Sequence, residues 1–159
     1  MRLAFLLGLL ASLLAADVAA QVPVGTQALT LSGGVGLRPT RAALGARYGY
    51  FLTPRLEAGP ALGVGYQRVR GDGVGLVSVG LGGRYWLGVP GLGVAPFVGT
   101  AADAVFLTGD DNDYALLEGN VGARAHLGRG VAFTPTAFVQ LTEFGDVGTG
   151  VRLGACAFF

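Results

Sequence analysis

The sequence predicts an all-β fold, an eight-stranded antiparallel up-and-down transmembrane β-barrel, and three observations support this class. The first is composition: 52% of the residues are hydrophobic and only 13% are charged, about half the charged share of an ordinary soluble domain. The second is the presence of 29 glycines, spaced so that they would interrupt any helix repeatedly. The third is a regular series of turn signals that separates segments of alternating side chains. Together they indicate strands that lie in lipid.

Residues 1–20 have the features of a secretory signal peptide. Met1 and Arg2 give a positively charged start, an apolar stretch of twelve residues runs from Leu3 to Leu14, and small residues precede Gln21. No later segment reaches the run of about 20 apolar residues that a transmembrane helix needs. We therefore expect a signal peptide at 1–20, cleaved before Gln21, and a barrel domain at 21–159.

Turn signals divide the remaining chain at regular intervals. They lie at 38–40, 53–54, 70–73, 88–93, 108–113, 128–130 and 145–146. Each segment between them is long enough to cross a bilayer at the usual tilt, which takes about 9–11 residues. The predicted strands are 26–37, 41–52, 55–68, 74–88, 93–107, 114–127, 131–143 and 147–159.

Alternate positions in these segments separate apolar from polar residues. In 55–68, Leu62 and Val64 share an apolar face, while Glu57 and Gly63 fall on the other. The polar faces are rich in glycine, which suits a narrow lumen but would make a poor soluble core. The apolar faces are therefore expected to meet lipid and the polar faces to line the interior. The barrel must close, because an open edge in hydrocarbon leaves backbone groups unpaired.

The inward faces carry a predicted luminal charge network: Arg47, Glu57, Arg84, Asp103, Glu118, Arg124 and Arg152. If the 68–74 hairpin closes around Arg70-Gly71, Glu57 lies opposite Arg84 as an ion pair. If the 107–114 hairpin closes around Asp110-Asp111, Asp103 lies opposite Glu118. Two carboxylates in that position need a cation, a shared proton or an arginine from another strand. By its depth along 147–159, Arg152 is the candidate for that role.

Aromatic residues are predicted to form two girdles at the membrane interfaces. One comprises Tyr50, Tyr85, Trp86, Phe133 and Phe159, and the other Tyr66, Phe106, Tyr114 and Phe144. The ordinary β-propensity of aromatic residues would instead scatter them along the strands.

Three segments resemble the small outer-membrane barrel family (OmpA-, OmpX- and OmpW-like). Residues 48–59 resemble its second strand, tight turn and third strand, 95–99 its fifth-strand opening, and 150–159 its closing strand. The resemblance covers 26–159 and implies architecture rather than function, since the family includes adhesins, structural barrels, small-solute pores and lipid-modifying enzymes. It also implies that the outer-membrane assembly machinery reads the last strand through Val151, Leu153, Ala155, Ala157 and Phe159.

Other candidate sites are weaker. Arg70-Gly71-Asp72 spells an integrin-binding tripeptide, but coincidence explains it better in a chain rich in glycine and arginine. The acidic run Asp110–Asp113 lacks the spacing of a calcium loop, although weak divalent binding stays open. The single histidine, His126, is expected to point inward with no serine near it, and Cys156 to be a small interior residue. We expect no catalytic residue, no metal and no cofactor.

The favoured function is an integral outer-membrane barrel with a structural or surface-interaction role, closed inside by its polar network. An eight-stranded barrel leaves an interior just wide enough for side chains. The alternative is a narrow, OmpW-like pore, since luminal glycines leave extra space, and a lipid-modifying enzyme is a distant third. Expected partners are outer-membrane lipid, lipopolysaccharide and the assembly machinery. A net charge of +1 without a basic run argues against nucleic acid, and we expect a monomer.

Overall fold

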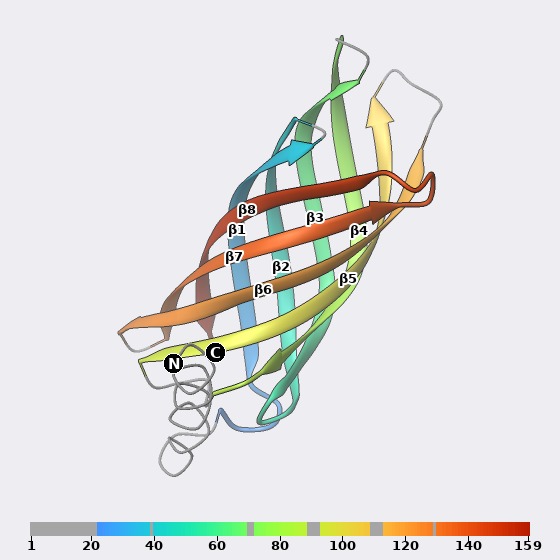
Figure 1. Cartoon of the computed structure of the whole chain (residues 1–159). Coiled ribbons are helices and arrows are strands. Elements are labelled where there is room, and N and C mark those ends of the chain that lie inside the picture. The colour runs from blue at the N-terminus through green and yellow to red at the C-terminus, as the bar shows by residue number, and fades with distance from the viewer. Residues whose placement is uncertain (1–21, 39, 70–71, 89–92, 109–112, 129) are drawn as a thin grey trace, which may run out of the picture.

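The computed structural model describes residues 22–38, 40–69, 72–88, 93–108, 113–128 and 130–159, which form one closed antiparallel barrel (Figure 1). Its strands are β1 Gln27–Arg38, β2 Arg41–Thr53, β3 Leu56–Val69, β4 Asp72–Trp86, β5 Val94–Thr108, β6 Tyr114–Gly128, β7 Val131–Thr142 and β8 Val147–Phe158. Each strand pairs with the next along the chain, and β8 closes on β1. The predicted fold class is confirmed. The predicted signal peptide lies outside the described residues.

Both ends of the described chain meet at one end of the barrel. There Gln27 and Phe159 exchange two backbone hydrogen bonds of 3.1 Å each. We call this the terminal end, and the end that carries the β1–β2 connection the far end. The strand bounds agree with the predicted ones within two residues; the largest difference is β4, which begins at Asp72 and ends at Trp86. No helix in the described part of the chain is long and apolar enough to cross a membrane.

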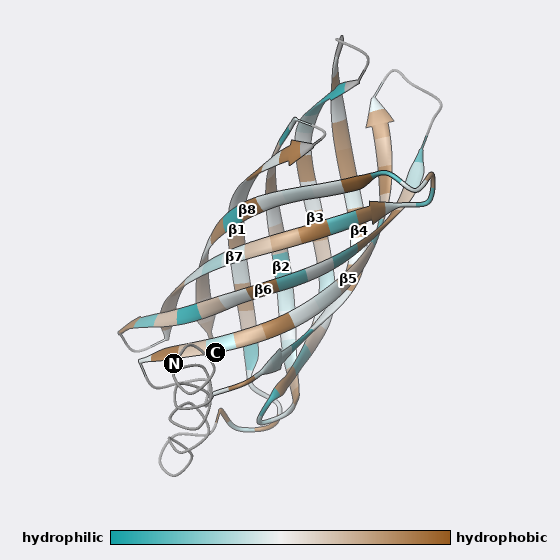
Figure 2. Cartoon of the chain, in the orientation of Figure 1, coloured by the Kyte–Doolittle hydropathy of each residue, from teal (hydrophilic) through white to brown (hydrophobic). Residues whose placement is uncertain are grey.

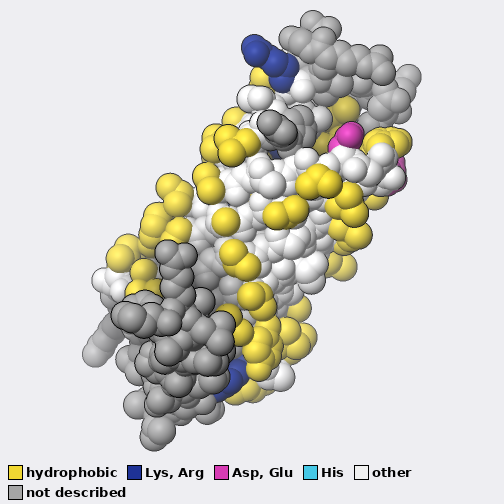
Figure 3. All heavy atoms as spheres, viewed as in Figure 1, with side chains coloured by type: hydrophobic (Ala, Val, Ile, Leu, Met, Phe, Trp, Pro, Cys, Tyr) yellow, Lys and Arg dark blue, Asp and Glu magenta, His cyan; other side chains and the backbone are white. Residues whose placement is uncertain are grey.

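The predicted alternation of faces is present in the structure. On β3, Leu62 and Val64 are 59% and 56% exposed, whereas Glu57 is fully buried. Figure 2 shows hydrophobic positions repeating along the strands, and in Figure 3 hydrophobic side chains cover the barrel wall while the visible charges lie towards its ends. A wall of exposed leucine and valine would be unfavourable in water and suits the hydrocarbon of a bilayer.

Two residues of the predicted aromatic girdles, Trp86 and Tyr114, point inward instead. Seven of the nine residues are exposed on the outside: Tyr50, Tyr66, Tyr85, Phe106, Phe133, Phe144 and Phe159. Trp86 is fully buried, and the Tyr114 hydroxyl donates a hydrogen bond of 2.9 Å to Oε1 of Gln67 on the inward face of β3. Because Tyr85 and Trp86 are neighbours in one strand, they cannot both point outward.

The interior holds two apolar clusters with the charged residues between them. The cluster at the terminal end consists of Val22, Ala28, Phe51, Trp86, Ala95, Phe97, Ala132 and Cys156, with Phe158 packed against it. The cluster at the far end consists of Leu76, Val105 and Leu116, with Leu107 and Tyr114. We call the four rings Phe51, Trp86, Phe97 and Phe158 the aromatic plug. The lumen is thus more apolar than the sequence suggested.

Candidate functional site: the luminal polar network

Strand register decides which of the predicted charges meet. Glu57 lies directly opposite Arg84 between β3 and β4, as predicted. The predicted opposition of Asp103 and Glu118 is wrong, because Glu118 faces Ala101 and Asp103 faces Leu116. The β5–β6 pairing is shifted by two residues, which keeps every side chain on its predicted face. This register avoids placing two carboxylates directly opposite each other, an arrangement that is destabilising.

The first group of charges surrounds Glu57. Nη2 of Arg124 donates to Glu57 Oε2 at 3.3 Å, and Nη1 of Arg84 lies 3.6 Å from Glu57 Oε1. The three side chains come from β3, β4 and β6, and none is more than 5% exposed. One carboxylate therefore holds together three strands inside the barrel. Buried charges are tolerated only when they are paired in this way.

The two guanidinium groups of this cluster stack on the aromatic plug. Cζ of Arg124 lies 4.3 Å from the ring centre of Trp86 and 5.0 Å from that of Phe158. Cζ of Arg84 lies 4.9 Å from the ring centre of Phe97. A planar guanidinium over a ring combines cation–π attraction with close packing. Rings and guanidinium groups together thus fill the lumen on the side of the terminal end.

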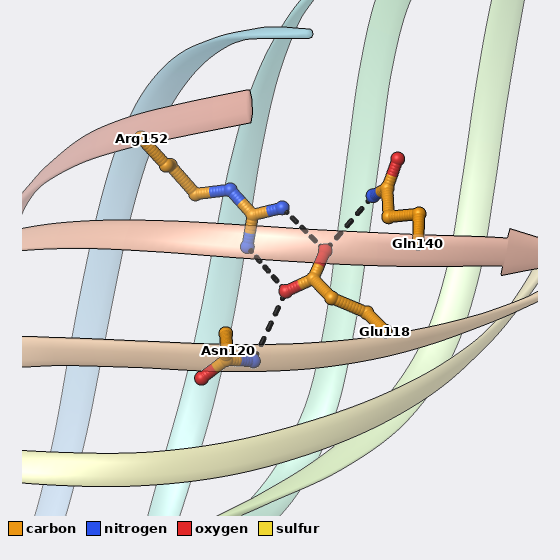
Figure 4. A network of polar contacts seen from close by, with 4 residues as sticks. All are labelled: Glu118, Asn120, Gln140 and Arg152. Atoms are coloured by element: carbon orange, nitrogen blue, oxygen red, sulfur yellow. Dashed lines mark hydrogen bonds and ion pairs between the residues drawn. The ribbon is translucent and has the colours of Figure 1, made fainter. Parts of the chain in front are cut away.

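The second group surrounds Glu118 on β6 (Figure 4). Arg152 of β8 donates to both carboxylate oxygens, at 3.2 Å from Nη1 to Oε1 and 2.8 Å from Nη2 to Oε2. Asn120 Nδ2 donates to Oε1 at 3.0 Å, and Gln140 Nε2 donates to Oε2 at 2.9 Å. Four donors match the lone pairs of a carboxylate. Arg152 therefore balances Glu118 and links β8 to β6, whereas the predicted role was to balance an opposed pair of Glu118 and Asp103.

A cavity of about 90 Å³ lies between the wall formed by β1, β2 and β3 and the charged groups around Glu57 and Glu118. It extends from Arg41, the first residue of β2 near the far end, to Arg84, which stacks on the plug. Its charged lining residues are Arg41, Arg47, Arg84, Asp103, Glu118 and Arg152. Small residues on the other side, among them Gly34, Gly45 and Gly63, leave the space open.

Known structures share this architecture. The N-terminal β-barrel domain of Pseudomonas aeruginosa OprF superposes with a TM-score of 0.66 at 20% identity, over 85% of this chain and 98% of that one. Neisserial surface protein A (NspA) gives 0.59 at 12% identity, over 84% and 95%. The chain has the fold of the small eight-stranded outer-membrane barrels. No family description and no curated protein sequence matches it.

A designed molecule has the same fold. One de novo transmembrane β-barrel superposes with a TM-score of 0.56 at 17% identity, over 88% of this chain and all of that one. Because a barrel made without a biological role shares the architecture, the fold of a small outer-membrane barrel specifies no activity by itself. Function has to be argued from the contents of the lumen and from the surface.

The remaining candidate residues form no second site among the described residues. His126 stacks on Phe158 with ring centres 5.3 Å apart, and Cys156 is buried in the terminal-end cluster. No three histidine, cysteine or acidic residues of the described ranges are grouped to hold a metal ion. Arg70, Gly71 and residues 109–112 lie outside the described residues, so the tripeptide and most of the acidic run are not placed. Asp113 Oδ1 accepts a hydrogen bond of 3.1 Å from the backbone of Leu107.

The proposed assembly residues share the outer face of the last strand. Val151, Leu153, Ala155, Ala157 and Phe159 are all exposed on the barrel wall. Their alternate positions match the predicted spacing. Their reading by an assembly machinery stays a prediction.

The network also has an uncharged part that was not predicted. These residues are the plug rings and the two amides Asn120 and Gln140. A usable signal was present, because Phe51 has the same parity as Arg47 and Trp86 the same parity as Arg84. Asn120 likewise follows Glu118 by two positions. The alternation does place Asn120 and Phe158 on inward faces, but the predicted network contained charged residues alone.

Proposed function

We propose that the protein is an integral outer-membrane barrel with a structural role in the envelope and a lumen that does not conduct. The apolar outer wall and the shared fold support the location. The observation that carries the non-conducting role is the plug: Phe51 and Trp86 are completely inaccessible to solvent, and so is Arg124, which stacks on Trp86. A solute that passed this level would have to displace stacked rings and separate Glu57 from its arginines.

The energetic cost of such a passage is large. Breaking a fully buried ion pair costs about 3–5 kcal/mol, and Glu57 has two arginine partners. The luminal cavity lies on the far-end side of the plug. Among the described residues its lining ends at Arg84 and does not reach the terminal end. The narrow-pore alternative is therefore less well supported than a closed wall.

A lipid-modifying activity has no support in the arrangement of nucleophile and base. His126 stacks on Phe158 in the interior, and the two serines of the described chain, Ser32 and Ser78, line the cavity above the plug. A serine nucleophile needs its base within hydrogen-bonding distance. A role in surface interaction would depend on the far-end connections, three of which contain residues outside the described ranges.

Conductance across a planar bilayer tests the closed lumen. The refolded barrel is expected to show no stable conducting steps. Trp86→Ala, which removes the central ring of the plug, should produce measurable steps, whereas Tyr85→Ala, the outward neighbour on the same strand, should not. Steady conductance of the unchanged protein would contradict the proposal.

Cell fractionation tests the location. The mature chain should be recovered with outer membranes and should migrate differently on gels before and after heating, as closed barrels do. Recovery as a soluble periplasmic protein would contradict an integral outer-membrane barrel.

A further inference from the structure

A groove crosses the outer wall of the barrel over β1 to β4. Its volume is about 630 Å³, and its outward lining consists of leucine, valine, alanine and glycine. Across the β1–β2 ladder Gly33 lies opposite Leu44, and Ala46 lies opposite Leu31. Each small residue leaves space beside a leucine that is more than half exposed. We call this space the wall groove, and because the wall faces hydrocarbon, its chemistry suits an acyl chain.

Two polar side chains lie on the same outer face nearer the far end. Arg68 continues the outward series of Leu62 and Val64 on β3; it is exposed and forms no ion pair with a described residue. Gly73 of β4 lies opposite Arg68, and a Cβ atom at Gly73 would overlap the hydroxyl of Tyr66. The half-exposed ring of Tyr66 therefore leans toward the far end and carries its hydroxyl to the level of Arg68. A guanidinium and a hydroxyl thus share one stretch of the outer surface.

The distance between the wall groove and Arg68 matches one leaflet of a bilayer. Leu62 borders the groove and lies six residues before Arg68 on β3, roughly 20 Å along a strand that rises about 3.4 Å per residue. At the usual tilt of about 40° this is roughly 15 Å of depth, half of the hydrocarbon thickness of about 30 Å. With Arg68 among the headgroups, the groove therefore lies where the acyl chains of that leaflet end. In Figure 3 arginine atoms at the far end lie at the edge of the hydrophobic wall.

We propose that the outer wall binds one phosphate-bearing anionic lipid of the leaflet at the far end. The Arg68 guanidinium, whose N–H groups form a fork that matches phosphate oxygens, and the Tyr66 hydroxyl donate to its headgroup. One acyl chain passes over Ala42, the small residue opposite Tyr66, and ends in the wall groove. A second copy of the barrel suits this face less well, because a symmetric contact would bring two copies of Arg68 together. The site rests on the proposed location in a membrane and not on whether the lumen conducts.

Native mass spectrometry of the refolded mature chain in an uncharged detergent tests the site. The barrel is mixed with dimyristoyl phosphatidylglycerol or with dimyristoyl phosphatidylcholine, which have the same acyl chains but differ in headgroup charge. One molecule of the anionic lipid should be retained per barrel, about fivefold more strongly than the zwitterionic lipid, the preference expected from one arginine at a membrane surface. Equal retention of the two lipids, or a dimer without bound lipid, would overturn the proposal.

Two variants assign the headgroup selectivity. Arg68→Gln should abolish the roughly fivefold preference for the anionic lipid and leave retention of the zwitterionic lipid unchanged. Tyr66→Phe, which removes only the hydroxyl, should weaken the preference by a factor of about two to three. Tyr85→Phe is the matched control, since its ring is exposed to a similar extent but lies near the other end of the barrel. An unchanged preference in Arg68→Gln would exclude the headgroup site.

A third variant tests the wall groove separately. Ala46→Leu fills the space beside Leu31 and should lower the retention of both lipids about twofold or more, because the acyl chain loses its close contacts. The control is Ala137→Leu, on the exposed outer face of β7. Equal retention by these two variants would exclude the groove as the site of the chain. Conductance and cell fractionation are measured independently of lipid retention, so this proposal and the proposed function can fail separately.

Discussion

Gly49 of β2 lies directly against the carboxyl group of Glu57. A Cβ atom at Gly49 would overlap Oε1 of Glu57 and crowd its Cγ and Cδ. The absence of a side chain on β2 is what allows the carboxyl group to lie between Arg84 and Arg124. A glycine thus sets the position of the central charge of the lumen.

Gly49→Ala should therefore destabilise the barrel by about 1–3 kcal/mol, the usual cost of overpacking a filled interior. The control is Gly83→Ala on β4, where a Cβ would meet only a backbone oxygen at 3.7 Å, an ordinary contact. Chemical unfolding of both variants measures the difference. Equal losses at the two glycines would show that Glu57 can move away without cost.

The Glu57 ion pairs should be strongly coupled. Glu57→Gln is expected to cost about 3–5 kcal/mol, because it leaves two buried guanidinium groups without a counterion. Arg124, which makes the hydrogen bond, should show a larger coupling energy with Glu57 than Arg84, which lies slightly farther away. Double-mutant cycles with Arg124→Met and Arg84→Met provide both values. Coupling near zero in both cycles would mean that the pairs do not hold the wall together.

Glu118 and Asp103 should respond differently to the loss of charge. In Glu118→Gln an amide N–H donor replaces one of the two carboxylate oxygens that accept hydrogen bonds from four donor atoms. The expected cost is about 1–3 kcal/mol and no more, because Arg152 keeps some contact with water after it loses its counterion. Asp103→Asn, at a site with no ion pair among the described residues, should be close to neutral. The same unfolding assay compares them. A larger loss for Asp103→Asn would contradict the observed register.

A charged residue on the outer wall should destabilise the barrel in a membrane. Val64→Arg, on the exposed face of β3, is expected to cost about 2–4 kcal/mol or to block insertion. Gly63→Ser on the luminal side should be much milder, because the one close contact of a Cβ there is the rotatable Ser78 hydroxyl at 2.5 Å, and the next atoms lie at 3.6 Å or more. Refolding yields and unfolding energies in lipid vesicles measure both. The reverse order of penalties would invert the assignment of faces.

The last residue should matter for assembly in cells more than for stability. Phe159→Ala is expected to lower the amount of folded barrel in outer membranes several-fold while refolding in vitro stays normal. Phe144→Ala is the matched control, since the two rings are exposed to a similar extent, 66% and 68%. Equal recovery of the two variants from cells would argue against a role for the C-terminal strand as an assembly signal.

The alternation of side chains predicted the faces but could not predict every register. Moving a strand by two residues keeps Asp103 and Glu118 inside, so the pattern of faces is identical in both pairings. Glu57 and Arg84 were placed correctly because β3 and β4 pair in the predicted register, with Val69 opposite Asp72. For β5 and β6 a hairpin closed around Asp110-Asp111 predicts Asp103 opposite Glu118, whereas Glu118 pairs with Ala101, two residues away.

The plug escaped prediction for a different reason. Aromatic residues near strand ends suit both a membrane interface and the end of a narrow lumen, and composition does not separate the two. Trp86 was predicted to lie at a membrane interface because it is near a strand end, although it shares the parity of Arg84, which points inward. The contact of Arg124 with Trp86 depends in addition on how closely β4 and β6 approach across the barrel, which only the three-dimensional structure reveals.

The pairing of β1 with β8 has a consequence for the order of folding. All other pairings join neighbours in sequence and can form as local hairpins, whereas this one brings Ala28 next to Phe158. Joining ends about 130 residues apart in a flexible chain carries an entropic cost of roughly 4 kcal/mol, far more than any single hairpin. The seam is therefore expected to form last, after the seven hairpins have shortened the effective loop. Until this seam forms, the sheet keeps two open edges, and an open edge in hydrocarbon leaves backbone groups unpaired.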